Sequence, residues 1–146
     1  MINIRKMTLK DIFSVAEIEK ETFSIPWSEK AFQESLSLNN TIYVVAEEAD
    51  KIVAYCGMYI SMEDGNITNV AVSKNHRRKH IGEQAVAYLL RLAKEQGVKH
   101  VTLEVRQTNV SAIRLYEKLG FREAGIRKDF YDKPKEHALI MWKLHL

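Results

Sequence analysis

The chain has 146 residues, of which 46% are hydrophobic and 28% charged, a composition typical of one globular domain, here residues 1–146, with its own core. The net charge of +3 is too small for a protein dedicated to nucleic acids, so we expect no direct nucleic-acid partner. One cysteine excludes an internal disulfide and no apolar run could span a membrane, so we expect a soluble, cytoplasmic protein with no membrane partner.

The N-terminal segment has the pattern of a strand followed by a helix. Residues 2–7 include alternating apolar and polar side chains, as a strand does. Thr8 is placed to cap a helix, and Asp11 is at the position where a carboxylate returns the hydrogen bond. We expect the apolar face of this helix to consist of Leu9, Ile12, Phe13, Ala16 and Phe23.

A turn that contains a proline and an aromatic residue, Ile25-Pro26-Trp27-Ser28, ends this helix. Ser28 is expected to cap a short second helix. Trp27, just before the cap, is placed to pack on Phe32 inside that helix, an arrangement that fixes the angle at which the chain enters.

The remaining elements alternate in type and define the fold class. We predict strands at 41–48, 51–62, 66–73, 100–106, 121–127 and 138–145, with hairpin turns at Asp50-Lys51 and Asp64-Gly65. Two amphipathic helices are predicted, one ending at Gly97 and one covering 112–119. The order β-αα-βββ-α-β-α-ββ predicts an α/β fold, with a mixed, mostly antiparallel sheet and helices on both faces.

A basic turn precedes the first of these two helices. Six of the seven residues at 74–80 are lysine, arginine or histidine, the exception being Asn75. Gly82 follows at the helix start. Free N–H groups at a helix start attract anions, basic side chains hold phosphate oxygens, and glycine allows close approach. The turn is therefore a candidate phosphate site. It matches neither the P-loop nor the dinucleotide fingerprint, and a solvated basic loop is the alternative.

The histidines of this turn and the single cysteine are expected to have no role in chemistry. His76 and His80 are four residues apart, but no cysteine or carboxylate cluster accompanies them, so we expect no metal site. Cys56 has no neighbouring base that would activate a thiol, and we expect it to be a packed strand residue.

Glu104 and Tyr116 are candidates for chemistry. Glu104 lies in the middle of a predicted strand, on the side opposite Val101, Leu103 and Val105. It is either an exposed or salt-bridged residue or a carboxylate tuned to accept a proton. Tyr116 falls on the apolar side of its helix. Core packing is its simplest role, although a buried hydroxyl needs a partner.

Several motifs of the chain resemble those of a known family. Residues 77–82, RRKHIG, resemble the pyrophosphate turn Arg/Gln-x-x-Gly-x-Gly/Ala of the GCN5-related N-acetyltransferase (GNAT) superfamily, and residues 109–121 match its pattern N-x-x-A-x-x-L-Y-x-x-x-G-F. Residues 26–30 and 103–106 are similar to segments of the bacterial ribosomal-protein-alanine N-acetyltransferases within that superfamily. The resemblance covers nearly the whole chain.

The resemblance implies acetyl-CoA as co-substrate, no metal, and a protein or peptide N-terminus, such as that of a ribosomal protein, as acceptor. Glu104 is then the general base and Tyr116 the general acid. An α-amine has a pKa of about 8 and must lose a proton before it attacks. The implied donor-binding residues are Val70, Ala71, Val72, Arg77, Arg78, Lys79, His80, Ile81, Gly82, Glu83, Asn109 and Tyr116.

Two residues depart from the family pattern. His80 stands where the first glycine of the turn is usual, and a positive φ would strain it. His137 stands where relatives often carry an acidic residue, which affects the acceptor side. Three functions stay open at this point: a protein N-terminal acetyltransferase, an acetyltransferase for lysine side chains or small amines, and a non-catalytic acetyl-CoA-binding module.

Overall fold

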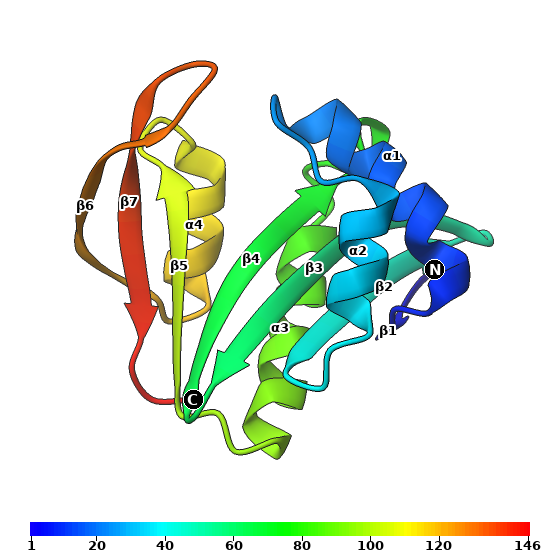
Figure 1. Cartoon of the computed structure of the whole chain (residues 1–146), viewed down its shortest axis with the longest axis horizontal. Helices are drawn as coiled ribbons and strands as arrows, with labels where there is room; N and C mark the ends of the chain where they lie inside the picture. Colours follow the sequence, from blue (N-terminus) through cyan, green and yellow to red (C-terminus); the bar gives the residue numbers. More distant parts are fainter.

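Seven strands form one mixed sheet in the order β1-β2-β3-β4-β5-β7-β6, and only β4 and β5 are parallel neighbours. The computed structural model describes residues 1–146, and Figure 1 shows helices on both sides of the sheet. The strands are β1 (Ile2–Lys6), β2 (Thr41–Glu48), β3 (Lys51–Ser61), β4 (Asp64–Val72), β5 (His100–Arg106), β6 (Arg122–Tyr131) and β7 (Glu136–Lys143). The helices are η1 (Leu9–Asp11), α1 (Ile12–Thr22), α2 (Glu29–Leu36), η2 (Lys74–His76), α3 (Ile81–Glu95) and α4 (Val110–Lys118). The predicted fold class and element order are confirmed.

The core has two main layers, one on each face of the sheet, and each is covered by helices. α1 and α2 pack over β2, β3 and β4 on one face, where Val15, Phe32, Tyr55 and Ala71 belong to one buried cluster. α3 packs on the other face, where the largest cluster also takes in Tyr116 of α4. Cys56 of β3 belongs to this second cluster, and burial raises the pKa of its thiol, as a packed strand cysteine requires.

The predicted apolar face of α1 is wrong in part. Leu9 and Phe13 are each 64% exposed. The buried side of the helix consists of Ile12, Val15, Ala16, Ile18 and Glu19. Because Leu9–Asp11 form a 3-10 turn with about three residues per turn, a helical phase counted from Leu9 does not continue into α1.

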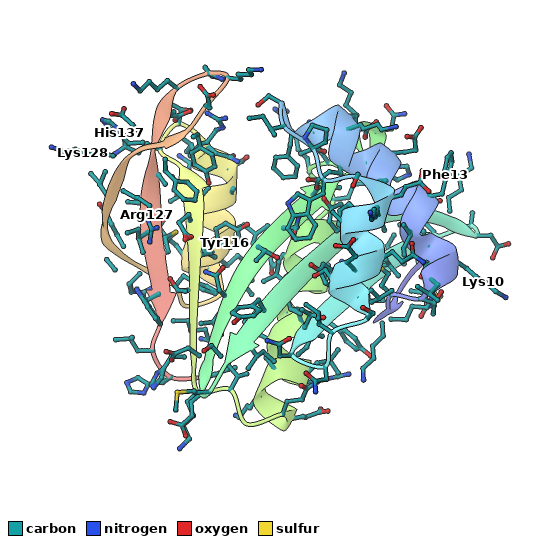
Figure 2. All side chains as sticks on the ribbon, viewed as in Figure 1. Lys10, Phe13, Tyr116, Arg127, Lys128 and His137 are labelled. Atoms are coloured by element: carbon teal, nitrogen blue, oxygen red, sulfur yellow. The ribbon has the colours of Figure 1, made fainter.

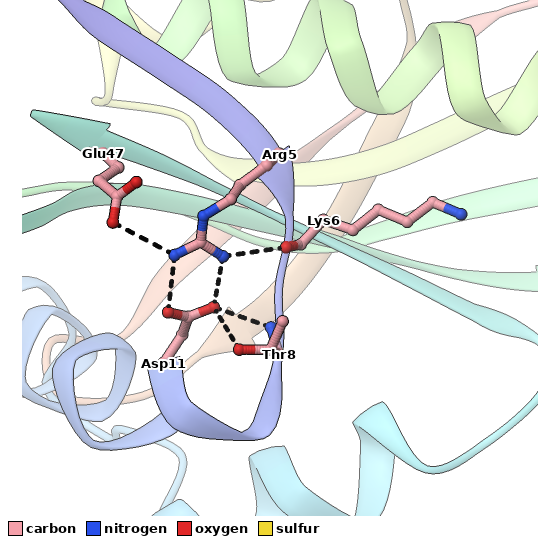
Figure 3. A network of polar contacts seen from close by, with 5 residues as sticks. All are labelled: Arg5, Lys6, Thr8, Asp11 and Glu47. Carbon is pink, nitrogen blue, oxygen red and sulfur yellow. Dashed lines mark hydrogen bonds and ion pairs between the residues drawn. The ribbon is translucent and has the colours of Figure 1, made fainter. Parts of the chain in front are cut away.

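A polar network fixes the entry into this helix (Figure 3). The Arg5 guanidinium donates to both oxygens of Asp11, at 2.8 and 2.9 Å, and to Glu47 of β2 at 3.4 Å. The same carboxylate accepts from the Thr8 N–H at 2.8 Å, the bond that the capping pattern predicts. Burial raises the pKa of Asp11, but the hydrogen bonds from Arg5 and Thr8 outweigh burial and hold it below its usual value.

The second helix and its cap are confirmed. The Ser28 hydroxyl accepts from the Ala31 N–H at 3.1 Å, and the Trp27 ring packs on Phe32 with centroids 5.3 Å apart. The chain between α1 and α2 is therefore held at its α2 end by the helix cap and by an aromatic contact.

Both predicted hairpin turns are shifted by one or two residues. The first turn is at Ala49 and Asp50, both with positive φ, and β3 already begins at Lys51. The second turn precedes β4, so Asp64 and Gly65 are strand residues. Gly65 is closely packed, because a Cβ there would lie 2.6 Å from the Met58 sulfur and the Met58 side chain would have to move.

The sheet opens between its two parallel strands. β4 and β5 pair only from Asp64–Ile67 with His100–Leu103. Asn69 pairs with Gly57 of β3 and Ile67 with Met58, which leaves Thr68 as the extra residue of a β-bulge. A bulge bends its strand, and from this point β4 turns away from β5, as Figure 1 shows.

Candidate active site

The basic turn before α3 has two residues in the left-handed region. Arg78 has φ of 64° and His80 has φ of 60°. His80 occupies the N-cap position of α3 but its side chain forms no capping bond, so the first backbone N–H groups of the helix are left for another acceptor. The positive φ puts His80 at a position that favours glycine, so the strain anticipated from the sequence is present.

Three contacts hold this turn against the rest of the protein. The Lys74 N–H donates to the Glu21 carboxylate of α1 at 2.9 Å. His76 Nε2 lies 3.5 Å from Glu48 at the end of β2. The Arg77 Nε–H donates to the Val72 carbonyl at 3.1 Å, so this guanidinium is directed back along the chain, whereas Arg78 and Lys79 are exposed and form no ion pair.

Close packing and one ion pair define the first turn of α3. A Cβ on Gly82 would lie 3.3 Å from Leu115 of α4 and 3.3 Å from Val72 of β4. The Glu83 carboxylate lies 3.0 Å from Lys118 Nζ of α4, and the hydrogen bond from Lys118 lowers its pKa. Glycine at 82 therefore lets the helix start sit close to both neighbours, while the Glu83 side chain is already engaged.

Alternation along β5 puts Glu104 on the face of the sheet that carries α1 and α2. Its neighbours Leu103 and Val105 are buried in the cluster beneath α3, so Glu104 points the other way. Ala71 of β4 also faces α1 and α2, whereas Val70 faces α3. The basic turn at the start of α3 and the Glu104 carboxylate consequently lie on opposite faces, and the gap between β4 and β5 joins them.

Tyr131, at the end of β6, was missed by sequence reasoning. Burial raises the pKa of Tyr131 to about 12, and the negative charge of Glu104 is the second cause of that rise. The Arg106 guanidinium lies 4.4 Å from the centre of the Tyr131 ring. The sequence indicates only the partner of Tyr131: Arg106 is two residues from Glu104 and must share its face of the strand.

Arg106 also fastens the hairpin between β6 and β7 over β5. Its guanidinium donates to the carbonyls of Pro134 at 2.8 Å and Asp132 at 3.2 Å and to Glu136 at 3.2 Å. Glu136 accepts in addition from the N–H and the hydroxyl of Thr108, at 2.8 and 2.7 Å. These bonds fix the hairpin that carries Tyr131 beside Glu104.

Tyr116 of α4 is 7% exposed and belongs to the large core cluster. Its ring makes an edge contact with Phe121, with centroids 5.8 Å apart. Burial raises the pKa of its hydroxyl, and Cys56 and Tyr131 raise it further. The side chain therefore lies within electrostatic range of Tyr131, and Figure 2 labels it on α4 beside β5.

Two residues flagged in the sequence have local structural partners. The Asn109 side chain accepts from the Ala112 N–H at 3.3 Å and caps α4, which leaves its amide NH₂ group to donate elsewhere. His137 accepts from the Asp129 N–H through Nδ1 at 2.9 Å. Asp129 has φ of 52° within the irregular part of β6, so His137 stabilises that bend at the outer end of the hairpin.

Residues 12–121, most of the chain, match the model of the Acetyltransferase (GNAT) family. The chain belongs to the GNAT family. It is an N-acetyltransferase that uses acetyl-CoA.

Two relatives and one solved structure match nearly the whole length of this GNAT protein. A putative [ribosomal protein bS18]-alanine N-acetyltransferase of Bacillus subtilis is 39% identical, over 95% of this chain and 93% of that protein. The [ribosomal protein bS18]-alanine N-acetyltransferase of Escherichia coli K12 is 30% identical, over 97% and 96%. The crystal structure of the ribosomal-protein-S18-alanine N-acetyltransferase from Escherichia coli superposes with a TM-score of 0.91 at 29% identity, over 100% and 96%.

The basic turn of this GNAT protein fits the pyrophosphate of acetyl-CoA. Free N–H groups at the start of α3 and the exposed cations of Arg78 and Lys79 supply donors and charge for an anion. Among the side chains, no group of three or more His, Cys, Asp and Glu residues could hold a metal ion. No helix is long and apolar enough to cross a membrane.

Proposed function

We propose that this GNAT protein acetylates the N-terminal α-amino group of a protein, in the cytoplasm, and that its acceptor is the N-terminal alanine of a ribosomal protein. The names of the relatives from Bacillus subtilis and Escherichia coli support this acceptor. The observation that carries the proposal is the placement of Glu104. Its carboxylate faces away from the donor turn, at the opening of the sheet and beside Tyr131.

The donor and the acceptor approach from opposite faces in this proposal. Acetyl-CoA is held by its pyrophosphate at residues 77–83, on the α3 side, with Asn109 donating to the pantetheine arm. Beyond Ile67 the edge of β4 has no partner in β5. The N–H of Ala71 points to β3, as that of Ser73 does, so the N–H groups of Val70 and Val72 are the ones available to polarise the thioester carbonyl. The amine arrives on the α1 and α2 side, where Glu104 lies.

Transfer proceeds directly between the two substrates. Glu104 accepts a proton from the α-ammonium group, which is mostly protonated near neutrality. The free amine attacks the thioester carbon, a C–N bond forms, and the tetrahedral intermediate expels the CoA sulfur. Tyr116 donates its proton to that sulfur, so that CoA leaves as the thiol. The nitrogen loses its second proton as the amide forms, and that proton restores the Tyr116 phenol.

The acceptor is tested by mass spectrometry of acetylated peptides. We expect acetylation of a peptide that begins with the alanine of a ribosomal protein, on its α-nitrogen. The same peptide with a blocked α-amine and a free lysine is the matched control, and a polyamine is a second one. Preferential acetylation of the lysine peptide or of the polyamine would replace the proposed acceptor, and absence of turnover with all three would favour a binding module.

A further inference from the structure

Glu19 on α1 is a buried carboxylate that the proposed mechanism does not use. The residue is 2% exposed, and no lysine, arginine or histidine forms an ion pair with it. Glutamate is rarely buried to this extent, because removing its charge from water is costly unless hydrogen bonds replace the water. The side chain therefore has a structural or functional partner that compensates for this cost.

Both oxygens of Glu19 accept hydrogen bonds, one from the α1–α2 turn and one from β3, the strand next to β4. One oxygen accepts from the backbone N–H of Trp27, in the turn between α1 and α2, at 2.9 Å. The other accepts from the hydroxyl of Tyr55 on β3, which is fully buried. Burial raises the pKa of Tyr55, Glu19 raises it further, and Asn69 acts in the opposite direction through a hydrogen bond.

Asn69 extends this chain of contacts to the bulge in β4. It is 5% exposed and follows Thr68, the extra residue of the bulge. The Asn69 side-chain oxygen accepts from the Thr68 hydroxyl at 2.6 Å. Hydrogen bonds thus run from the turn before α2 through Glu19 to Tyr55, and Asn69, at the point where β4 leaves β5, lowers the pKa of that tyrosine.

A second connection reaches the same bulge from α2. The hydroxyls of Ser35 and Tyr43 are 2.7 Å apart. Burial raises the pKa of Tyr43, and hydrogen bonds from Ser35 and from Thr68 of the bulge oppose the rise. The α2 helix is therefore bonded to Tyr43 of β2 through Ser35, and Thr68 of the bulge lowers the pKa of that tyrosine.

We propose that Glu19 is a positioning residue that holds the α1–α2 turn against Tyr55 of β3, the strand next to the β4 bulge, and so sets the acceptor side of the active site relative to the donor side. This inference rests on the proposed function. Glu19 and Glu104 share one face of the sheet, so the turn that Glu19 fixes borders the side from which the amine arrives. An ionised carboxylate accepts from both donors, whereas a glutamine amide has one neutral oxygen and can accept from only one of them; its NH₂ group opposes the Trp27 N–H or makes the Tyr55 hydroxyl turn round to accept.

The test compares Glu19→Gln, Tyr55→Phe and the double variant with Val98→Ala as a control for general destabilisation. Val98 is a buried core residue of the α3 side and contacts none of the network. We expect Glu19→Gln to raise the acceptor KM about tenfold, the effect of losing one hydrogen bond to a charged group. The Kd of acetyl-CoA is expected to change by less than about twofold, since the donor turn keeps its contacts. Because Glu19 and Tyr55 act as one unit, the double variant is expected to raise KM no more than Glu19→Gln alone.

A second measurement does not depend on turnover. Hydrogen exchange of the Trp27 backbone amide reports directly on the bond to Glu19, and we expect exchange at least about tenfold faster in Glu19→Gln than in Val98→Ala. Equal exchange in the two variants, or an unchanged acceptor KM in Glu19→Gln, would overturn the positioning role. If the wild-type protein acetylates no peptide, the proposed function fails, and the Trp27 exchange still decides whether Glu19 holds the turn.

Discussion

Besides burial, the charge of Glu104 on β5 raises the pKa of Tyr131 on β6, although β7 lies between their strands in the sheet. Burial is the main cause that raises the pKa of Tyr131 to about 12, and the Glu104 carboxylate is the next. The hairpin that carries Tyr131 is held over β5 by Arg106. The carboxylate proposed as the base therefore lies within electrostatic range of a tyrosine whose hydroxyl stays protonated at neutral pH and remains a hydrogen-bond donor.

Glu104→Gln keeps the shape of the side chain and removes its basicity. We expect kcat/KM for an N-terminal peptide to fall by roughly 10²–10⁴-fold at pH 7. Part of the loss is expected to disappear at high pH, where the amine loses its proton unaided. Rates for both proteins between pH 6 and pH 10 check this, and near-normal activity of the variant at pH 7 would remove Glu104 from the mechanism.

Tyr116→Phe keeps the buried ring and removes the hydroxyl. We expect kcat to drop while the Kd of acetyl-CoA stays close to normal, with a stability change of no more than about 1–2 kcal/mol. The deficit in kcat is expected to shrink with an acetyl donor whose thiol has a lower pKa, since a better leaving group needs less protonation. The same deficit with both donors would mean that Tyr116 is a packing residue only.

Arg78→Gln tests the phosphate site. The exposed guanidinium of Arg78 forms no ion pair within the protein, so its loss is expected to weaken CoA binding without unfolding the turn. Calorimetry with CoA and with a pantetheine fragment that lacks the pyrophosphate separates the contributions. The expected result is a large loss for CoA and almost none for the fragment, and equal losses would contradict a phosphate contact at this residue.

His80→Gly relieves a left-handed residue at the start of α3. With φ of 60° at His80, glycine is expected to raise the free energy of unfolding by about 1 kcal/mol and to leave CoA affinity unchanged or improved. Met62→Gly, at φ of 57° in an exposed turn, is the matched control for strain. A severe loss of CoA affinity in His80→Gly alone would show that the histidine itself contacts the ligand.

Asp11→Asn tests the network at the N-terminus. The pKa of Asp11 is lowered in the folded state: burial raises it, and the hydrogen bonds from Arg5 and Thr8 more than offset burial. A lowered carboxyl pKa contributes stability above its unfolded pKa of about 3.9, and this stability is lost as pH falls through the folded value. Urea unfolding is expected to show wild type more stable than Asp11→Asn by about 1–3 kcal/mol from pH 5 to pH 8, a difference that shrinks below pH 4. A difference that does not change down to pH 2 would assign the effect to packing.

Local features of this chain follow from its sequence alone. Ser28 caps α2 where the pattern predicts it, because a cap depends on residues within one turn. The alternation 101–105 puts Glu104 opposite Leu103 and Val105, because side chains of a strand point to alternate faces regardless of its neighbours. The order of strands and helices was predictable for the same reason, since each element has its own period.

The tertiary structure alone decided which of these elements meet. The bulge at Thr68 depends on the register between β3 and β4, and Tyr131 reaches Glu104 only because β7 pairs with both β5 and β6. Glu19 and Tyr55 are 36 positions apart in the chain, and no local pattern marks a contact of that kind. Pairing and burial between distant segments depend on the free energy of the whole packed core, so they appear only when all the elements are in place.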